Sequence, residues 1–231
     1  MKYFIICSFF LNFKVFALIN GVELKDNIPV VSLEFKNQSF CTGIFINSRT
    51  ILTAAHCLEN NHPIINIRDT KFERIKYELE RYISHPRYKK RLFGSIHDLG
   101  LIVLKNNISR NDFPTLYSGG KLSYDGLFYA CGKTDITLNM RSCTQGENSY
   151  MLWLDQVWSF GLSCSEDNSG TEVSIAPNDS GGVIIDQKLN EIIAIMWGTQ
   201  TPNFYKFCII APSFSTPLTD AENIEFIKRY L

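Results

Sequence analysis

Three short segments of the chain contain residues that together could activate a hydroxyl group as a nucleophile. In chain order they are TAAHC with His56, HDLGLIVL with Asp98 and PNDSGG with Ser180. A serine hydroxyl is a weak nucleophile unless a base takes its proton, and a histidine base needs a third group that fixes its tautomer. The three residues are far apart in the sequence, so only a fold can bring them together.

The segments that must position these residues have the length and composition of β-strands. Apolar runs rich in Val, Ile and Phe are bounded by Asn, Asp, Gly and Pro, which is typical of strands and turns. They are PVVSLEF, SFCTGIFIN, RTILTAAHC, DLGLIVLK, LFYACG and the expected hairpin GGVIID and NEIIAIMWG. The last segment, TDAENIEFIKRYL, is different because Thr219 and Glu222 form a helix-capping box. We therefore expect an all-β sandwich or barrel with one closing helix, and a crossover between two halves near residues 106–120.

The composition favours a folded domain and excludes one broad class of partner. The chain has 231 residues, and 45% of them are apolar, which is enough for a sizeable core. Lys plus Arg and Asp plus Glu both number 23. Without net charge there is no electrostatic signature of nucleic-acid binding.

The first 17 residues are typical of a secretory signal peptide. Lys2 precedes an apolar run from Tyr3 to Phe13, and Val15 and Ala17 occupy the −3 and −1 positions of a signal-peptidase site. We expect cleavage after Ala17, and a protein that is secreted (or periplasmic in a bacterium) and not held in a membrane afterwards. The alternative, a buried strand or short helix, stays open because Lys14 is unusual so close to a cleavage point.

The three motifs resemble those of the trypsin and chymotrypsin family of serine proteases. The order His, Asp, Ser is the order of that family, and the α/β-hydrolases and subtilisins use different ones. Further matches are FCTGIFIN, HPRY and the MWG segment at Trp197–Gly198, so the resemblance covers residues 18–231. It implies two packed antiparallel six-stranded β-barrels, the catalytic site in the cleft between them, and a C-terminal α-helix.

The resemblance also implies an activity, which is that of a serine endopeptidase. Ser180 would attack the scissile carbonyl, His56 would take and return the proton, and Asp98 would orient the imidazole. The partners would be protein or peptide substrates and protein inhibitors, and we expect a monomer. We expect no cofactor and no metal, since the four histidines form no recognised metal-binding motif.

In this family a freed apolar N-terminus inserts into the molecule and pairs with the aspartate before the nucleophile. The matching segment here is LING, which starts at Leu18, directly after the expected signal cleavage. The resemblance therefore implies an activation pair between the Leu18 ammonium and Asp179. Signal peptidase would then release an active enzyme without a propeptide.

The resemblance places a specificity pocket and an oxyanion hole. The pocket floor is Ser174, and Trp197, Gly198 and Ser213 line the substrate site. A pocket without a charged floor disfavours Lys and Arg before the scissile bond and favours apolar or aromatic residues. The oxyanion hole consists of the backbone N–H groups of Asn178 and Ser180.

Three positions depart from the family pattern. Asn178 replaces a glycine of the oxyanion hole, Met196 replaces a serine that would bond the triad carboxylate, and Ala176 replaces a cysteine. Asparagine tolerates positive φ well, but it has a Cβ atom that glycine lacks. These departures motivate an alternative, in which the chain is a pseudoprotease that acts as a secreted binding module.

Six cysteines remain after removal of Cys7 with the signal peptide. An even number in an exported chain predicts three disulfides, and six cysteines can pair in 15 different ways. The resemblance implies Cys41–Cys57. A local Cys131–Cys143 bridge is plausible because the two residues flank an expected hairpin. Cys164–Cys208 then follows by elimination.

Overall fold

The structure is a computed structural model. It describes residues 21–24, 27–61, 63–71, 73–91, 94–123, 125–133, 141–153, 157–163, 175, 178–199 and 211–231. The predicted signal peptide, Leu18, Ser174, Ala176 and the Cys164–Cys208 pair therefore lie outside the described residues. Within the described part of the chain, no helix is long and apolar enough to cross a membrane.

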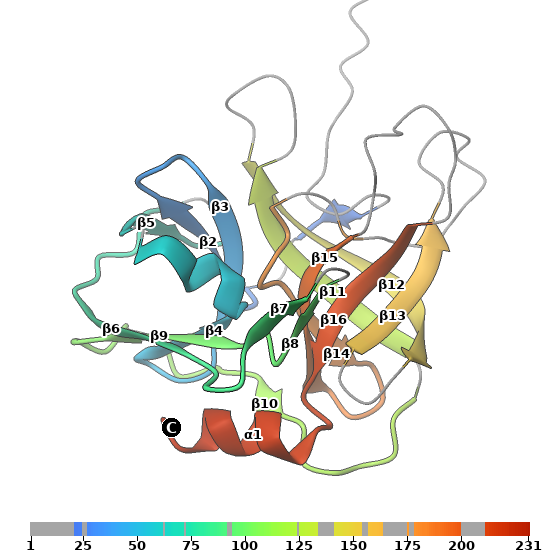
Figure 1. Ribbon diagram of the computed structural model, residues 1–231. Helices are drawn as coiled ribbons and strands as arrows, with labels where there is room; N and C mark the ends of the chain where they lie inside the picture. The colour runs from blue at the N-terminus through green and yellow to red at the C-terminus, as the bar shows by residue number, and fades with distance from the viewer. Residues whose placement is uncertain are drawn as a thin grey trace, which may run out of the picture.

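The N-terminal half forms a curled six-stranded antiparallel sheet (Figure 1), in the order β5-β2-β3-β4-β9-β6. Its two edge strands are linked by tyrosine side chains: the Tyr82 hydroxyl accepts from Ile64 N (3.1 Å), and the Tyr77 hydroxyl donates to Ile64 O (2.7 Å). Burial raises the pKa of both tyrosines. The strands are β2 (Val30–Phe35), β3 (Phe40–Phe45), β4 (Thr50–Thr53), β5 (Ile64–Arg68), β6 (Leu79–Ser84) and β9 (Gly100–Leu104).

The C-terminal half forms a closed six-stranded antiparallel barrel. Strand β13 pairs with both β12 and β16, which completes the ring β11-β12-β13-β16-β15-β14. Two short strands are added to it: β1 (Val22–Glu23) pairs with β12, and β10 (Thr115–Leu116) runs parallel to β15. The barrel strands are β11 (Asp125–Lys133), β12 (Arg141–Trp153), β13 (Val157–Ser163), β14 (Val183–Asp186), β15 (Glu191–Thr199) and β16 (Ala211–Pro217).

Three further elements lie around the two sheets (Figure 1). The 3₁₀ helix η1 (Ala55–Asn61) follows β4, and the hairpin of β7 (Lys89–Arg91) and β8 (Gly94–Ile96) precedes β9. Helix α1 (Ala221–Lys228) ends the chain, and the Asp220 carboxylate caps it by accepting from Glu222 N and Asn223 N. The predicted cap at Thr219 was therefore wrong by one residue, because a carboxylate and a hydroxyl are both good caps and the local sequence does not choose between them.

The core explains why the apolar runs form these strands. Strands β4 and β9 are buried along their whole length, and β11 packs against β2 and β3 across the interface of the two halves. Strands that are covered on both faces need continuous apolar sequence instead of alternation. The expected all-β fold of two six-stranded antiparallel barrels with a C-terminal helix is confirmed.

Candidate active site

His56 is held by two hydrogen bonds to one buried carboxylate, one from its backbone and one from its ring. His56 lies at the start of η1, and Asp98 lies between β8 and β9. Asp98 Oδ1 accepts from the His56 backbone N–H (2.8 Å), and Asp98 Oδ2 lies 2.8 Å from His56 Nδ1. Asp98 is fully buried. One carboxylate thus fixes both the backbone and the ring of the histidine.

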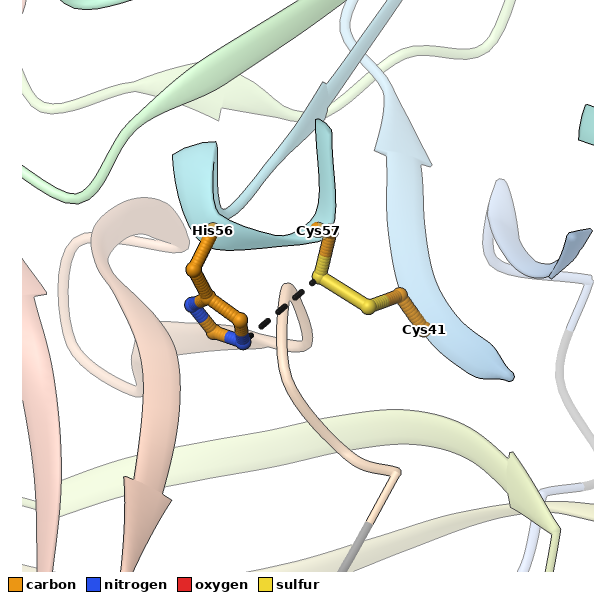
Figure 2. Close-up of side chains that lie close together, drawn as sticks. All are labelled: Cys41, His56 and Cys57. Atoms are coloured by element: carbon orange, nitrogen blue, oxygen red, sulfur yellow. Dashed lines mark hydrogen bonds between the residues drawn. A yellow bond between two sulfur atoms is a disulfide. The ribbon is translucent and has the colours of Figure 1, made fainter. Parts of the chain in front are cut away.

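This geometry fixes the tautomer of His56. An ionised carboxylate only accepts hydrogen bonds, so Nδ1 carries the proton and Nε2 presents its lone pair. The Nε2 atom points into the interface, 3.8 Å from the sulfur of Cys57 (Figure 2). A neutral histidine in this state can act as a general base.

The Cys41–Cys57 disulfide predicted from the resemblance is present and joins β3 to η1 (Figure 2). Cys41, His56 and Cys57 are close enough together to suggest a metal site. Metal binding by cysteine requires a free thiolate. Because both sulfurs are bonded to each other, this trio is not a metal site.

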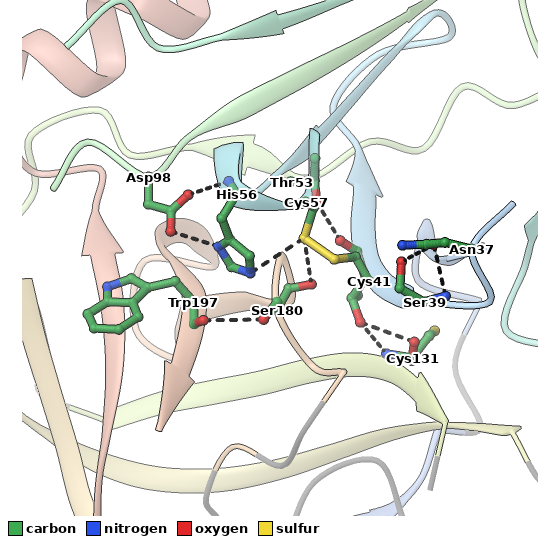
Figure 3. The surroundings of a disulfide bond; sticks show 11 residues. Asn37, Ser39, Cys41, Thr53, His56, Cys57, Asp98, Cys131, Ser180 and Trp197 are labelled. Carbon is green, nitrogen blue, oxygen red and sulfur yellow. Dashed lines mark hydrogen bonds and ion pairs between the residues drawn. A yellow bond between two sulfur atoms is a disulfide. The ribbon is translucent and has the colours of Figure 1, made fainter. Parts of the chain in front are cut away.

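Ser180 lies in a turn that faces His56 from the other half of the molecule (Figure 3). Its hydroxyl donates to the carbonyl of Trp197, at 3.2 Å. The hydroxyl must therefore exchange this acceptor for His56 Nε2 before it can give up its proton. Catalytic hydrogen bonds that form only when substrate binds are common.

The turn at Ser180 is anchored to both halves through its backbone. The Ser180 carbonyl accepts from Thr42 N (2.7 Å) in β3, and Gly181 N donates to Met196 O (2.7 Å) in β15. Gly181 has φ +85°, and a Cβ atom there would lie 2.1 Å from the Thr42 carbonyl oxygen. Only glycine fits this position.

Asn178 has φ +78°. This is the left-handed region that glycine prefers and that asparagine tolerates better than most residues. The backbone therefore has at Asn178 the conformation class that a glycine would supply. Asn178 has a side chain that glycine lacks, but it keeps the backbone N–H group.

Asp179 is fully buried beside the nucleophile, whereas Ser180 is half-buried. A buried carboxylate is stable only when it is paired or hydrogen-bonded. Its predicted partner Leu18 lies outside the described residues. The activation pair thus stays a prediction.

The substrate-binding residues that the structure describes are in β15 and β16. The half-buried Trp197 stacks on Phe214, with ring centroids 5.1 Å apart and an interplanar angle of 11°. The strand register pairs Gly198 with Phe214 and Thr199 with Ser213. Gly198 and Ser213 therefore lie diagonally across the two strands, and their place in a substrate pocket stays a prediction.

A cavity of about 240 Å³ lies beside the reactive side chains, on the side of the disulfide. His56, Asn178, Ser180 and the aromatic ring of Phe40 line it.

Cys131 is disulfide-bonded, and its Cα lies directly opposite that of Cys143 in the pairing of β11 with β12. Residues opposite each other in an antiparallel pair have the Cα separation that a disulfide requires. This register supports the predicted Cys131–Cys143 bridge.

Several residues around the site could not be recognised from any local sequence motif. The buried hydroxyls of Thr42 and Thr53 support the Ser180 turn: Thr53 Oγ1 donates to Thr42 O (2.7 Å), and Thr42 Oγ1 accepts from Cys131 N (2.9 Å). His97 lies in a bend between β8 and β9 with φ +48°. Its partner Asn223 comes from helix α1, with His97 Nδ1 2.7 Å from Asn223 Oδ1.

Two further titratable side chains near Asp98 have shifted pKa values. Burial raises the pKa of Tyr88, and the negative charge of Asp98 adds to the effect. Burial lowers the pKa of His85, and the neighbouring His97 lowers it further. Both groups are therefore held in the neutral form.

Comparison with known proteins gives consistent results. The family model described as Trypsin matches residues 19–218. The chain is 30% identical over 102 residues to human kallikrein-4 and 28% identical over 108 residues to rabbit (Oryctolagus cuniculus) coagulation factor IX. These matches cover 41% and 44% of this chain, and 39% of each relative's length. The structure of neuropsin, a serine protease of mouse brain, superposes with a TM-score of 0.67 at 17% identity, covering 90% of this chain and 97% of that chain.

Gly181→Ala should destabilise the protein and displace Ser180. We expect a loss of about 1–3 kcal/mol from backbone strain and a similar loss from overpacking, measured by urea denaturation. Gly119→Ala is the matched control, because Gly119 has φ +108° and nothing within 4 Å of an added Cβ. Equal losses in the two variants would contradict the close fit of the turn.

The raised pKa of Tyr88 predicts a loss of stability at alkaline pH. Above about pH 10 the unfolded chain ionises this tyrosine while the folded protein keeps it protonated, so the free energy of unfolding falls as the pH rises. Tyr88→Phe should make this fall less steep in denaturation curves recorded from about pH 8 to 11. A slope in Tyr88→Phe equal to that of the wild type would refute the assignment.

Proposed function

Because the chain belongs to the trypsin family of serine proteases, we propose that it is a secreted endopeptidase that cleaves peptide bonds through Ser180, His56 and Asp98. The observation that carries this proposal is the double hydrogen bond from His56 to the fully buried Asp98, opposite the Ser180 turn. The pair supplies a base with a fixed tautomer where the nucleophile needs it.

The reaction begins when the Ser180 oxygen attacks the scissile carbonyl carbon and His56 Nε2 takes the hydroxyl proton. The His56 imidazolium is stabilised by Asp98, which stays ionised. His56 then gives the proton to the leaving amine, and an ester to Ser180 remains. Water, deprotonated by the same histidine, hydrolyses this ester and releases the carboxylic acid.

The negative oxygen that develops on the carbonyl would be stabilised by the backbone N–H groups of Asn178 and Ser180. The positive φ of Asn178 supports this role, since the backbone there has a glycine-like conformation. One such donor is worth about 10²–10³-fold in kcat. The backbone at Asn178 therefore matters more to the reaction than its side chain.

The proposed substrates are proteins or peptides with an uncharged, apolar or aromatic residue before the scissile bond. Ser174, Gly198 and Ser213 would line this pocket, and none of them could pair with a buried Lys or Arg. Trp197, fixed by Phe214, would support the substrate backbone. Protein inhibitors that mimic such substrates would be the natural partners of a monomeric enzyme.

Activation would depend on the N-terminus that signal cleavage releases. Asp179 is fully buried, and an opposite charge beside a buried carboxylate would stabilise it; the Leu18 ammonium would supply that charge. The alternative function, a secreted binding module, would not need this pair or a reactive serine. Two experiments separate these functions.

The first experiment is covalent labelling. A fluorophosphonate should modify Ser180 in the correctly processed protein, while Ser180→Ala should not be labelled and should lose roughly 10⁴-fold or more in kcat on a peptide substrate. Ser39→Ala, which changes another serine lining the cavity, should keep full labelling. Absence of labelling in folded, processed wild-type protein would support the binding module instead.

The second experiment tests the activation pair. Loss of one partner of a buried ion pair costs about 3–5 kcal/mol, so Asp179→Asn should lower kcat/KM by roughly 10²- to 10⁴-fold. Asp186→Asn is the control, because Asp186 is also buried but bonds Ser123, Lys188 and Leu189. It should change stability more than kcat/KM. N-terminal sequencing of the secreted protein must give Leu18; any other start contradicts the pair.

A further inference from the structure

Next to the catalytic carboxylate, a buried histidine faces two acidic side chains of the C-terminal helix. The ligand atoms of His97, Asp220 and Glu222 all lie within 4.8 Å of one another. We call these three residues the His97 cluster. It joins the loop that holds Asp98 to the start of α1, although His97 is far from the other two residues in the sequence.

The tautomer of His97 is fixed by Asn223. The Asn223 side-chain amide donates to Pro217 O (2.8 Å), so its oxygen is the group that faces His97 Nδ1 at 2.7 Å. An amide oxygen only accepts, and Nδ1 must therefore carry the proton. The Nε2 atom of the neutral ring then has its lone pair directed into the cluster.

This lone pair has no hydrogen-bond partner among the described residues, although His97 is fully buried. The nearest charged atom, Glu222 Oε2, is 3.9 Å away, which is too far for a hydrogen bond. Buried polar atoms are nearly always bonded, so an unpartnered nitrogen beside two carboxylates is open to a ligand. Two carboxylates with an imidazole would attract a cation.

The geometry points to a zinc site, and we propose that His97 Nε2, Asp220 and Glu222 bind one Zn²⁺ with water as the fourth ligand. Tetrahedral zinc with bonds of about 2.0–2.2 Å brings its ligand atoms to about 3.4 Å from one another, so modest side-chain movement closes the cluster. Imidazole with carboxylates suits zinc, whereas calcium and magnesium prefer oxygen ligands alone. This proposal does not rest on the proposed protease activity.

Neighbouring groups orient the side chains of the His97 cluster, as metal sites require. Asn223 holds the far side of the His97 ring, and His85 stacks on it with centroids 4.6 Å apart and an interplanar angle of 6°. Asp220 Oδ1 is fixed by the backbone N–H groups at the start of α1. Metal-ligating histidines and carboxylates are oriented in this way.

Arg87 competes with the metal for one ligand. Its guanidinium bonds Glu222 Oε2 at 2.6 Å, but its side chain is 65% exposed. Exposed ion pairs contribute little to stability, so the arginine can move into solvent when a divalent ion takes its place.

Calorimetric titration of full-length processed protein with ZnCl₂ tests the site. We expect one bound Zn²⁺ and a higher Tm in its presence, since zinc binds the folded state. Glu222→Gln and Asp220→Asn should each weaken binding roughly ten-fold or more, and asparagine keeps the helix cap. Glu225→Gln, at an exposed residue of the same helix, is the matched control and should bind zinc as the wild type does.

Arg87→Ala gives the sharper test, because removal of the competitor should strengthen zinc binding. Arg91→Ala, which removes an exposed arginine of β7, should leave the zinc affinity unchanged. This control distinguishes loss of the Arg87–Glu222 bond from the loss of one positive charge elsewhere on the protein. The proposal is overturned if the wild type binds no zinc, or if Glu222→Gln binds it with wild-type affinity.

Discussion

The arrangement of the site depends on backbone hydrogen bonds that hold the turn at Ser180 between the two halves of the molecule. We call this set of bonds the clamp. The Ser180 carbonyl is bonded to Thr42 of β3, while Gly181 N bonds Met196 O and Met196 N bonds Gly182 O in β15. The histidine and aspartate belong to the N-terminal half, and the serine belongs to the C-terminal half. The distance between Ser180 and His56 is therefore set by this clamp, and Gly181 is required because a Cβ atom would force the halves apart.

The clamp is reinforced by buried threonine hydroxyls that connect three strands. Thr53 Oγ1 of β4 donates to Thr42 O of β3, and Thr42 Oγ1 bonds both backbone groups of Cys131 in β11. Both threonines are fully buried, and every bond they make is to backbone. Satisfied polar groups of this kind fix one relative arrangement of the two barrels, which apolar contacts alone would specify less sharply.

The sequence predicted the parts of the site that lie in short contiguous motifs. The runs of apolar residues predicted an all-β fold, the resemblance carried by the His56, Asp98 and Ser180 motifs implied the two barrels, and the His56–Asp98 contact was found as expected. It could not predict Thr42 with Cys131, 89 residues apart, or His97 with Asn223, 126 residues apart. Such pairs consist of ordinary residue types without local spacing, so they become visible only in the folded chain.

Asn178 and Met196 depart from the family pattern at positions where backbone groups, not side chains, make the contacts that matter to the site. At Asn178 the proposed role belongs to an N–H group, and the positive φ is retained. At Met196 the lost side-chain hydroxyl would have bonded Asp98, yet that carboxylate keeps two bonds from His56, while the N–H and C=O of Met196 bond the glycines after Ser180. The backbone at both positions is therefore compatible with the proposed enzyme, and neither side chain removes a backbone group that the proposed reaction needs.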